Sequence, residues 1–386
     1  MTRSHRLFAL ITACVLGPTL SGCRDSRSQV SATDEGCDSC AVKLRLAASL
    51  GSAADSSGID ILSSPSRDSS GRVLVGPMMG LYEFALFDSS GQFVRAVGVH
   101  GHGPGEFDNI QRVAFTRGDS VVVLDTRLTL LSPSLGFVRT VALPADVMPT
   151  ELLVLQDGSV VVNSHSAYGR AFTLFDANFR KIGSFGPTMV GAKEAQPSDL
   201  IYHMTRDKSG GFWAARQDRE PLLYHFDSLG RQMDSMVLPL IWYRPWPSTP
   251  SRHQDDFTST RPPPRISGIW LDPDGRMWIT GIVADTHWKP DLLAQLLSHS
   301  SEHSLPPPSE LAKLYDTFIE VVDVSTGTSF ARRRIDDIMA FSSDGSLWSF
   351  GEGPSGDLTI LLHKFVLDTV QAESLRPRDR SARSSS

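Results

Sequence analysis

Residues Gly101–Leu143 read GHGPGEFDNIQRVAFTRGDSVVVLDTRLTLLSPSLGFVRTVAL, and this stretch decides the fold. A loop rich in glycine and proline opens it. Four short strand-like runs follow, at Ile110–Phe115, at Val121–Leu124, up to Leu131 and at Phe137–Val141. Four short strands joined by tight turns within about 40 residues match one blade of a β-propeller. We therefore expect an all-β chain that repeats this unit.

Two series of turns repeat along the whole chain. In the first series a turn containing glycine precedes an apolar run, because glycine adopts positive φ without steric cost. These glycines are Gly71, Gly118, Gly158, Gly210, Gly275 and Gly345. The second series lies half a blade later, at Phe87–Gly91, Leu131–Gly136, Phe175–Asn178, Phe226–Gly230, Val322–Gly327 and, in degenerate form, Phe365–Asp368. Two interlocked series of six predict a six-bladed β-propeller with four-stranded blades.

A large or β-branched residue stands three positions after each glycine of the first series. These residues are Leu74, Val121, Val161, Trp213, Trp278 and Trp348. We interpret them as one repeated inward position that fills the space between neighbouring blades. Stacking of the three tryptophans on a carbohydrate is the alternative.

The beginning of the chain is typical of an exported lipoprotein. Residues 1–22 combine Arg3 and Arg6 with an apolar run that is too short for a membrane span. Leu20-Ser-Gly-Cys23 resembles the bacterial lipobox, in which the cysteine is acylated and becomes the first mature residue. We expect a flexible tether at 23–41, the propeller at 42–375 and a disordered tail at 376–386.

Cysteine usage gives little chemistry. Cys14 leaves with the signal and Cys23 would carry lipid, so Cys37 and Cys40 are the remaining thiols. A redox motif of this spacing opens a helix in a thioredoxin-like unit, and a zinc site needs two more ligands. A local disulfide or an inert pair is the interpretation we adopt.

The composition and net charge limit the kinds of partner that the protein is expected to bind. The chain has 386 residues, 40% hydrophobic and 21% charged, which is ordinary for a globular domain. The formal net charge is −6, and removal of Arg3 and Arg6 makes it −8. Nucleic-acid binders usually carry a basic face, so this balance does not favour a nucleic acid as partner.

Ring closure and loop insertions are the remaining architectural questions. Either an additional strand at Val42–Leu50 or the segment Val370–Leu375 can complete the last blade, since an open sheet edge invites pairing with other chains. Two long insertions, Pro239–Pro264 and Ala284–Asp316, fall on the face that carries the loops between blades.

The motif Gly101-His-Gly-Pro-Gly-Glu-Phe107, followed by a blade, is similar to the six-bladed β-propeller lipoproteins of environmental bacteria, which are related to NHL-repeat proteins. The resemblance covers about residues 42–375, although several later blades lack the Gly-Pro-Gly loop. It implies a fold and a location in the cell envelope more than an activity.

An acidic series stands at the starts of the innermost strands: Asp108, Glu151, Asp199, Asp336 and Asp337. Carboxylates that converge on a channel mouth can hold a hard cation such as Ca²⁺. The resemblance to lactonase-type propellers implies hydrolysis with such a metal. Polar residues at the starts of strands are the alternative.

A basic series precedes the third strands of blades 2, 3 and 4: Arg127, Arg170 and Arg219. With the aromatic residues Trp242, Tyr243 and Trp246 of the first insertion, these arginines are candidates for a site that binds a carboxylate or phosphate. A role in blade packing or solubility is the alternative.

The leading hypothesis is a lipid-anchored envelope propeller without enzymatic activity, which binds a small molecule, glycan or protein. It follows from the complete repeats, the lipobox and the lack of a recognisable nucleophile elbow, phosphate loop or Cys-His pair. A metal-dependent hydrolase or lactonase with an acidic channel mouth is the alternative. A structural partner that uses the Trp242–Trp246 loop is a third.

Overall fold

A computed structural model describes residues 41–51, 62–77, 82–143, 148–165, 169–188, 201–217, 220–244, 261–292, 308–352 and 358–368. All of them belong to one compact unit, Glu35–Ser386. The signal, the lipobox with Cys23, the pair Cys37 and Cys40, and the tail lie outside the described residues. No helix within the described ranges has the length and apolar character that a membrane crossing requires.

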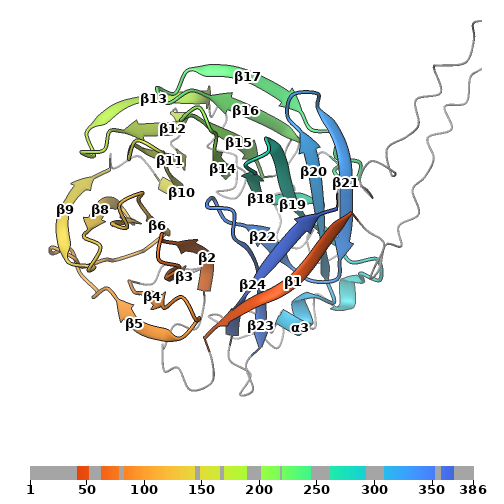
Figure 1. The fold of residues 1–386 in the computed structure, drawn as a ribbon, viewed down its shortest axis with the longest axis horizontal. Coiled ribbons are helices and arrows are strands. Elements are labelled where there is room, and N and C mark those ends of the chain that lie inside the picture. The colour runs from red at the N-terminus through yellow and green to blue at the C-terminus, as the bar shows by residue number, and fades with distance from the viewer. Residues whose placement is uncertain are drawn as a thin grey trace, which may run out of the picture. The chain divides into compact units, whose positions relative to one another are not determined.

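Six antiparallel sheets of four strands stand around a common centre, which confirms the expected six-bladed β-propeller (Figure 1). Blade 1 contains β2 (Leu62–Arg67), β3 (Val73–Pro77), β4 (Phe84–Phe87) and β5 (Phe93–Val97); blade 2 contains β6 (Arg112–Phe115), β7 (Val121–Leu124), β8 (Arg127–Leu131) and β9 (Phe137–Ala142); blade 3 contains β10 (Met148–Val154), β11 (Val160–His165), β12 (Arg170–Phe175) and β13 (Lys181–Thr188).

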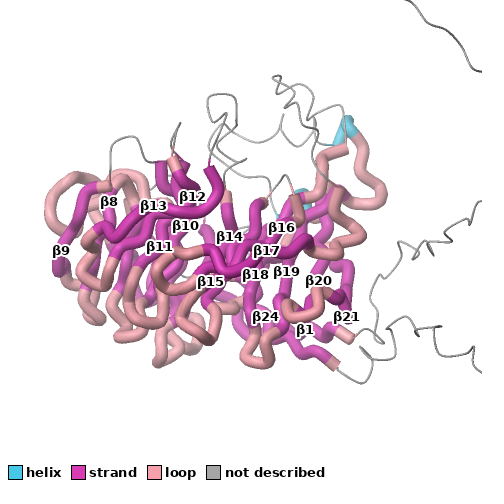
Figure 2. The backbone as a smooth tube through the Cα atoms, turned by 90° about the horizontal axis from the view of Figure 1, so that it is seen from above, coloured by secondary structure: helices cyan, strands magenta, loops and turns pink. Residues whose placement is uncertain are grey.

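The later blades repeat the four-stranded pattern. Blade 4 contains β14 (Tyr202–Arg206), β15 (Phe212–Arg216), β16 (Leu222–Phe226) and β17 (Gln232–Val237); blade 5 contains β18 (Arg265–Leu271), β19 (Arg276–Ala284), β20 (Tyr315–Asp323) and β21 (Thr328–Ile335); blade 6 contains β22 (Met339–Phe341), β23 (Leu347–Glu352), β24 (Leu358–Leu367) and β1 (Val42–Leu50). The helix α3 (Pro308–Leu311) belongs to the connection between β19 and β20. Seen edge-on, the helical residues lie on one face of the ring, at the top of Figure 2.

The N-terminal strand closes the ring. β1 pairs with β24 in antiparallel register, from Val42 opposite Leu367 to Leu50 opposite Ile360. Of the two candidates for closure, the sequence Val42–Leu50 is therefore the one used. Phe365–Asp368 is not a turn, contrary to the prediction: Phe365 and Leu367 belong to β24, and the fourth strand of blade 6 comes from the other end of the chain.

The core is a ring of interfaces between blades. Among the described residues, each pair of neighbouring blades shares one cluster of buried apolar side chains. The cluster between blades 3 and 4 holds Phe172, Phe212 and Phe226, whose rings lie 5.1–5.7 Å apart. Apolar burial between the blades is the main stabilising term, and it leaves the inner strands free to line the centre.

Aspartates set the turns within the blades. In six turns, the Oδ1 atom of an aspartate accepts hydrogen bonds from the backbone N–H groups two and four residues later. These aspartates are Asp68, Asp88, Asp176, Asp207, Asp227 and Asp272. An Asp side chain that bonds its own backbone in this way fixes a tight turn.

Blade 2 departs from the glycine rule. Asp119, not Gly118, has positive φ there (59°), so the turn is displaced by one residue relative to the other blades. Ala114 pairs with Val122 in the place where Ser66 pairs with Leu74. The residue equivalent to Leu74 is therefore Val122, and the prediction of Val121 was wrong by one position.

The three tryptophans of the repeated position differ in burial. Trp213 and Trp278 are buried, with 7% and 2% of their surface exposed, as expected of packing residues. Trp348 is only half-buried and borders the central cavity described below.

Candidate functional site

One repeated position of the innermost strands carries polar side chains into the centre of the ring. It lies seven residues before the positive-φ residue of the first turn in blades 1 to 4, where those turn residues are Gly71, Asp119, Gly158 and Gly210. The four side chains at this position are Ser64, Arg112, Glu151 and His203. Because a propeller places equivalent positions of successive blades side by side, these residues form a continuous arc.

Arg112 and Glu151 join blades 2 and 3 through a two-point ion pair. Arg112 Nε lies 2.9 Å from Glu151 Oε2, and Nη2 lies 2.5 Å from Oε1. Nη1 donates to the carbonyl oxygen of Gln111 at 2.7 Å. Burial alone would lower the pKa of Arg112, but the Glu151 carboxylate outweighs burial and raises it. The guanidinium therefore stays charged, and its planar geometry fixes the carboxylate beside it.

His203 is the next residue of the arc and has an unused ring nitrogen. Its Nε2 is buried and has no hydrogen-bond partner. Burial lowers the pKa of His203; Glu151 opposes this effect, and Arg112 adds to it. The imidazole is therefore neutral at pH 7 and leaves one buried nitrogen without a partner, which is unfavourable until a partner arrives.

A cavity of about 220 Å³ occupies the centre of the ring, and residues of all six innermost strands line it. Its wall includes Ser64, Arg112, Glu151, His203, Ser267 and Ala340, together with Trp348 from β23. The indole Nε1 of Trp348 is a second buried polar atom without a hydrogen-bond partner. The residues that line the cavity therefore include an ion pair, an imidazole and an indole, together with apolar side chains.

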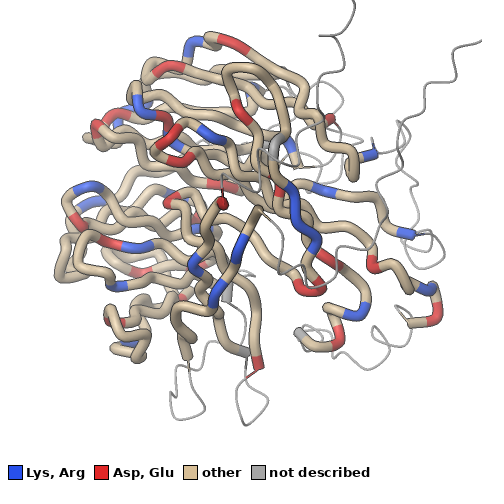
Figure 3. Tube along the Cα trace, turned by 45° about the vertical axis from the view of Figure 1, so that its right-hand side comes forward, with Lys and Arg blue, Asp and Glu red and all other residues tan. Residues whose placement is uncertain are grey.

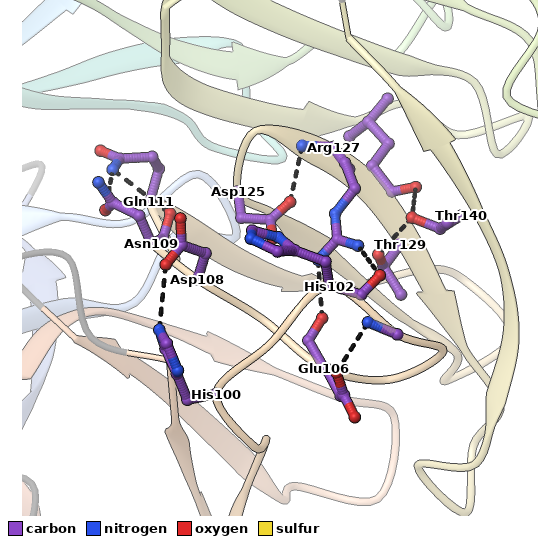
Figure 4. A network of polar contacts seen from close by, with 12 residues as sticks. His100, His102, Glu106, Asp108, Asn109, Gln111, Asp125, Arg127, Thr129 and Thr140 are labelled. Atoms are coloured by element: carbon purple, nitrogen blue, oxygen red, sulfur yellow. Dashed lines mark hydrogen bonds and ion pairs between the residues drawn. The ribbon is translucent and has the colours of Figure 1, made fainter.

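Arg127 holds the glycine-rich loop of the opening motif (Figure 4). Its Nη1 donates to the carbonyl oxygen of His102 and its Nη2 to that of Glu106, both at 2.8 Å, and Asp125 pairs with it at 3.1 Å. The loop connects blade 1 to blade 2, so this guanidinium fixes one blade connection. A packing role is thus supported for Arg127.

Arg170 lies at the corresponding place in blade 3 and donates to the carbonyl oxygen of Gly186 at 3.0 Å. Arg219 lies outside the described residues. In the view of Figure 3 the basic and acidic residues of the described blades are interspersed. Convergence of the three arginines on an anion stays a prediction.

Trp242 and Tyr243 pack in the apolar cluster between blades 4 and 5. The indole of Trp242 stacks on Phe318 with 4° between the ring planes, and its Nε1 donates to Glu320 Oε2 at 2.7 Å. Tyr243 is 7% exposed and belongs to the apolar cluster between these blades. Trp246 lies outside the described residues, and an aromatic wall formed by this loop stays a prediction.

The members of the acidic series lie in different surroundings. Asp108 faces His100 on the surface at 3.2 Å, whereas Glu151 pairs with Arg112 in the cavity. Asp336 lies near Asp285 and Asp316, and Asp337 accepts a hydrogen bond from the backbone N–H of Ile338. Asp199 falls outside the described ranges. Among the residues that the structure does describe, Asp108, Glu151 and Asp336 do not share one group of ligand atoms.

Sequence reasoning missed Arg112 and His203. Like Glu151, both stand seven residues before the positive-φ residue of the first turn in their blade, and this common spacing was the available signal. The displaced turn at Asp119 hid it in blade 2, because counting from Gly118 gives a different position. Asp285 and Asp316 were missed because Asp285 directly follows the second strand of blade 5 and Asp316 lies at the start of the third, and these ends meet only after folding.

No family model matches the chain, and no curated protein matches it. Among solved structures, the chain is similar to a Bacteroides fragilis protein that is described as exported, with a TM-score of 0.56 and 13% identity, covering 86% of this chain and 97% of that chain. It is also similar to virginiamycin B lyase from Staphylococcus aureus, with a TM-score of 0.46 and 12% identity, covering 84% of this chain and 99% of that chain. At such identities the likeness to the B. fragilis protein supports the propeller fold and assigns no activity.

Proposed function

We propose that the chain is an exported, lipid-anchored propeller that binds a small polar ligand in its central cavity. One observation carries this proposal: the bidentate pair Arg112–Glu151 and the unused imidazole nitrogen of His203 lie side by side on the wall of the same cavity. Buried polar groups are normally hydrogen-bonded, and exceptions often mark a site for a ligand, water or ion.

The cavity also indicates the size and chemistry of the ligand. Its 220 Å³ lies below the range of about 300–1,000 Å³ that is typical of sites for drug-sized molecules, so a molecule of monosaccharide or amino-acid size fits best. The Trp348 Nε1–H can donate a hydrogen bond, and the His203 imidazole can donate or accept one, if the ligand turns these buried nitrogens toward the cavity. A ligand with both a hydrogen-bond donor and an acceptor matches this wall.

The alternative of a metal-dependent hydrolase required carboxylates that converge at the channel mouth. Glu151, the described member of that series which reaches the cavity, is occupied by Arg112. This arrangement favours binding over hydrolysis at this place.

The lipid anchor belongs to the same proposal. Leu20–Cys23 supports acylation of Cys23, and two or more acyl chains hold a protein on a membrane where a single chain holds it only marginally. Such an anchor would present the cavity to molecules of the cell envelope.

Calorimetric titration of the chain with monosaccharides, free amino acids and short dicarboxylates tests the ligand class. We expect a ligand whose affinity falls at least about tenfold, or 1.4 kcal/mol, in His203→Ala and in Trp348→Phe. His102→Ala changes an exposed loop histidine and serves as the control, with unchanged affinity. Binding that survives both cavity substitutions, or a panel in which nothing binds, contradicts the proposal. Chemical turnover of a bound compound would favour the hydrolase.

A further inference from the structure

Three aspartates of blade 5 meet at one end of the blade, apart from the central cavity. Asp285 follows β19, Asp316 lies at the start of β20, and Asp336 follows β21. One carboxylate oxygen from each lies within 4.8 Å of the other two. None of the three lines the cavity.

Asp316 is the buried member of the group, and one of its carboxylate oxygens has no hydrogen-bond partner. It is 3% exposed. Its Oδ2 accepts a hydrogen bond from Arg334 Nε at 2.5 Å, and Arg334 Nη2 makes a further ion-pair contact with the same oxygen. Its Oδ1 is buried and has no hydrogen-bond partner. A buried carboxylate oxygen without a donor is costly unless a cation or a proton satisfies it.

A second carboxylate, that of Asp285, lies beside Asp316. Burial, with a contribution from the neighbouring Asp285 carboxyl, raises the pKa of Asp316 to about 6, although Arg334 opposes this. Asp285 Oδ1 accepts a hydrogen bond from the backbone N–H of His287 at 2.5 Å, and the His287 ring lies 3.4 Å from it.

Two further groups complete the surroundings. The Arg261 guanidinium donates to the backbone carbonyl oxygens of Ala284 and Asp285, not to a carboxylate. Asp336 is exposed. Three carboxylates therefore face one directly paired guanidinium, and the exposed side of the group is open to water.

We propose that Asp285, Asp316 and Asp336 bind one Ca²⁺ ion. Calcium takes six to eight oxygen ligands at about 2.3–2.6 Å, so two ligands on opposite sides of the ion lie about 4.6–5.2 Å apart. The three oxygens fit within that span, and water completes the shell on the exposed side. Mg²⁺ demands a tighter octahedron at about 2.0–2.1 Å and gives up its water reluctantly, so it fits this loose set less well.

The ion would have a structural consequence. It would tie the connection between β19 and β20, which holds Asp285, to the connection between blades 5 and 6, which holds Asp336, with Asp316 as the third ligand. A proton shared between Asp285 and Asp316 is the competing way to satisfy Oδ1, and it requires no metal.

The test is titration of the chelator-treated chain with Ca²⁺ at pH 7.5, by calorimetry and by the shift in Tm. We expect one Ca²⁺ per chain with a Kd on the order of 10⁻⁴–10⁻³ M, as in extracellular calcium modules, and weaker binding of Mg²⁺. Asp336→Asn changes an exposed side chain and should fold normally, yet it should weaken Ca²⁺ binding at least tenfold. Asp234→Asn, an exposed aspartate of β17, is the matched control and should bind as the parent does.

A second readout keeps the test independent of Tm. The backbone N–H of Trp288 donates to the carbonyl oxygen of Asp285 at 3.2 Å, so Trp288 is a tryptophan whose main chain contacts a residue of the proposed site. Tb³⁺ bound in place of Ca²⁺ should luminesce on tryptophan excitation, and Trp288→Phe should reduce that emission. No Ca²⁺ binding at millimolar concentration, equal binding by Asp336→Asn, or tighter binding of Mg²⁺ would each overturn the proposal.

Discussion

Arg112 and Glu151 show how a single pair of residues can join two blades and also shape the cavity. Their side chains are 25% and 16% exposed, so water screens the pair only partly. Each partner satisfies the charge of the other, and neither has an alternative partner of opposite charge at the same distance in the described structure. The pair therefore matters most when one member is missing.

Replacing Glu151 with alanine should lower the free energy of unfolding by about 2–3 kcal/mol, because Arg112 would keep its charge without a carboxylate. The double variant Arg112→Met, Glu151→Leu should recover most of this loss, since it leaves no unpaired charge. Urea unfolding of the parent and both variants measures the difference. Equal losses in the single and double variants would show that the pair matters for packing and not for charge.

His203 should make stability depend on pH in a defined direction. Burial lowers its pKa below the ordinary value of 6.5, and the charges of Arg112 and Arg265 lower it further. The Glu151 carboxylate and a hydrogen bond with the Ile266 backbone act in the opposite direction. As the pH falls through 6.5, the unfolded chain binds a proton that the folded chain does not bind. Stability is therefore lost as the pH falls, until the pH reaches the folded-state pKa.

The contribution of His203 is up to about 1.4 kcal/mol per pH unit. Urea unfolding at several values between about pH 7.5 and 5 should show a shallower loss for His203→Gln than for the parent. The comparison between variants is needed because Asp316, whose pKa is raised to about 6, contributes in the opposite direction. His102→Gln should follow the parent, and parallel curves for parent and His203→Gln would contradict the assignment of a neutral, buried imidazole.

At the scale of an element, the segment that follows β17 is held in place by the indole of Trp242, which packs directly on Gly281 of β19. A Cβ added to Gly281 would lie 1.9 Å from Cη2 of Trp242. The close approach of β19 to the indole thus requires glycine at this position. It also places Trp242 Nε1 at Glu320, a fully buried carboxylate that Arg332 neutralises.

Gly281→Ala should displace Trp242 and lower the free energy of unfolding by about 1–3 kcal/mol, as is usual for overpacking. Tryptophan fluorescence should shift to longer wavelength as the indole gains contact with water. Gly183→Ala in β13 is the control, because a Cβ there meets nothing within 4 Å. An unchanged spectrum for Gly281→Ala would show that Trp242 does not rest on β19.

The register of the closing strand gives a covalent test. Arg45 lies opposite Lys364, and both are exposed. Residues directly opposite in an antiparallel pair have Cα atoms about 4.5–5.5 Å apart, which suits a disulfide. In a chain with its four native cysteines replaced by serine, Arg45→Cys with Lys364→Cys should oxidise readily. Arg45→Cys with Val366→Cys, two residues out of register, should oxidise poorly, and the reverse order would disprove the pairing.

Much of each blade could be predicted from the sequence because strands and turns are local. The strands of blade 2 begin and end within two residues of the predicted runs, since tight turns at 116–120 and 132–136 bound them. The sequence did not decide which of two segments closes the ring, because pairing between β1 and β24 depends on residues that are far apart in the chain. The arc of Ser64, Arg112, Glu151 and His203 was hidden for a related reason: it exists only between blades, and the turn at Asp119 shifts its register by one residue.

At the scale of the whole molecule, the lipid anchor at Cys23 is the main expectation from the sequence. Residues 24–41 would separate an acylated Cys23 from β1. Cys23→Ser should release the protein from membranes, because a chain without acyl groups loses the interaction that holds it. Mass spectrometry of the mature N-terminus, with fractionation of membranes, measures both effects. A mature chain that begins at another residue would contradict the anchor, and Cys14→Ser should leave fractionation unchanged.

Closure by β1 also dictates an order of events during synthesis. The ribosome makes Val42–Leu50 first, yet its partner Leu358–Leu367 follows more than 300 residues later. Until that partner emerges, the earliest strand has no neighbour in the sheet, and the growing chain carries unpaired edges at both ends. Contacts so distant in sequence form slowly, because the chain must first bring its ends together. The ring can therefore become complete only after β24 has been made, and the interval before closure is when the chain is most exposed to aggregation.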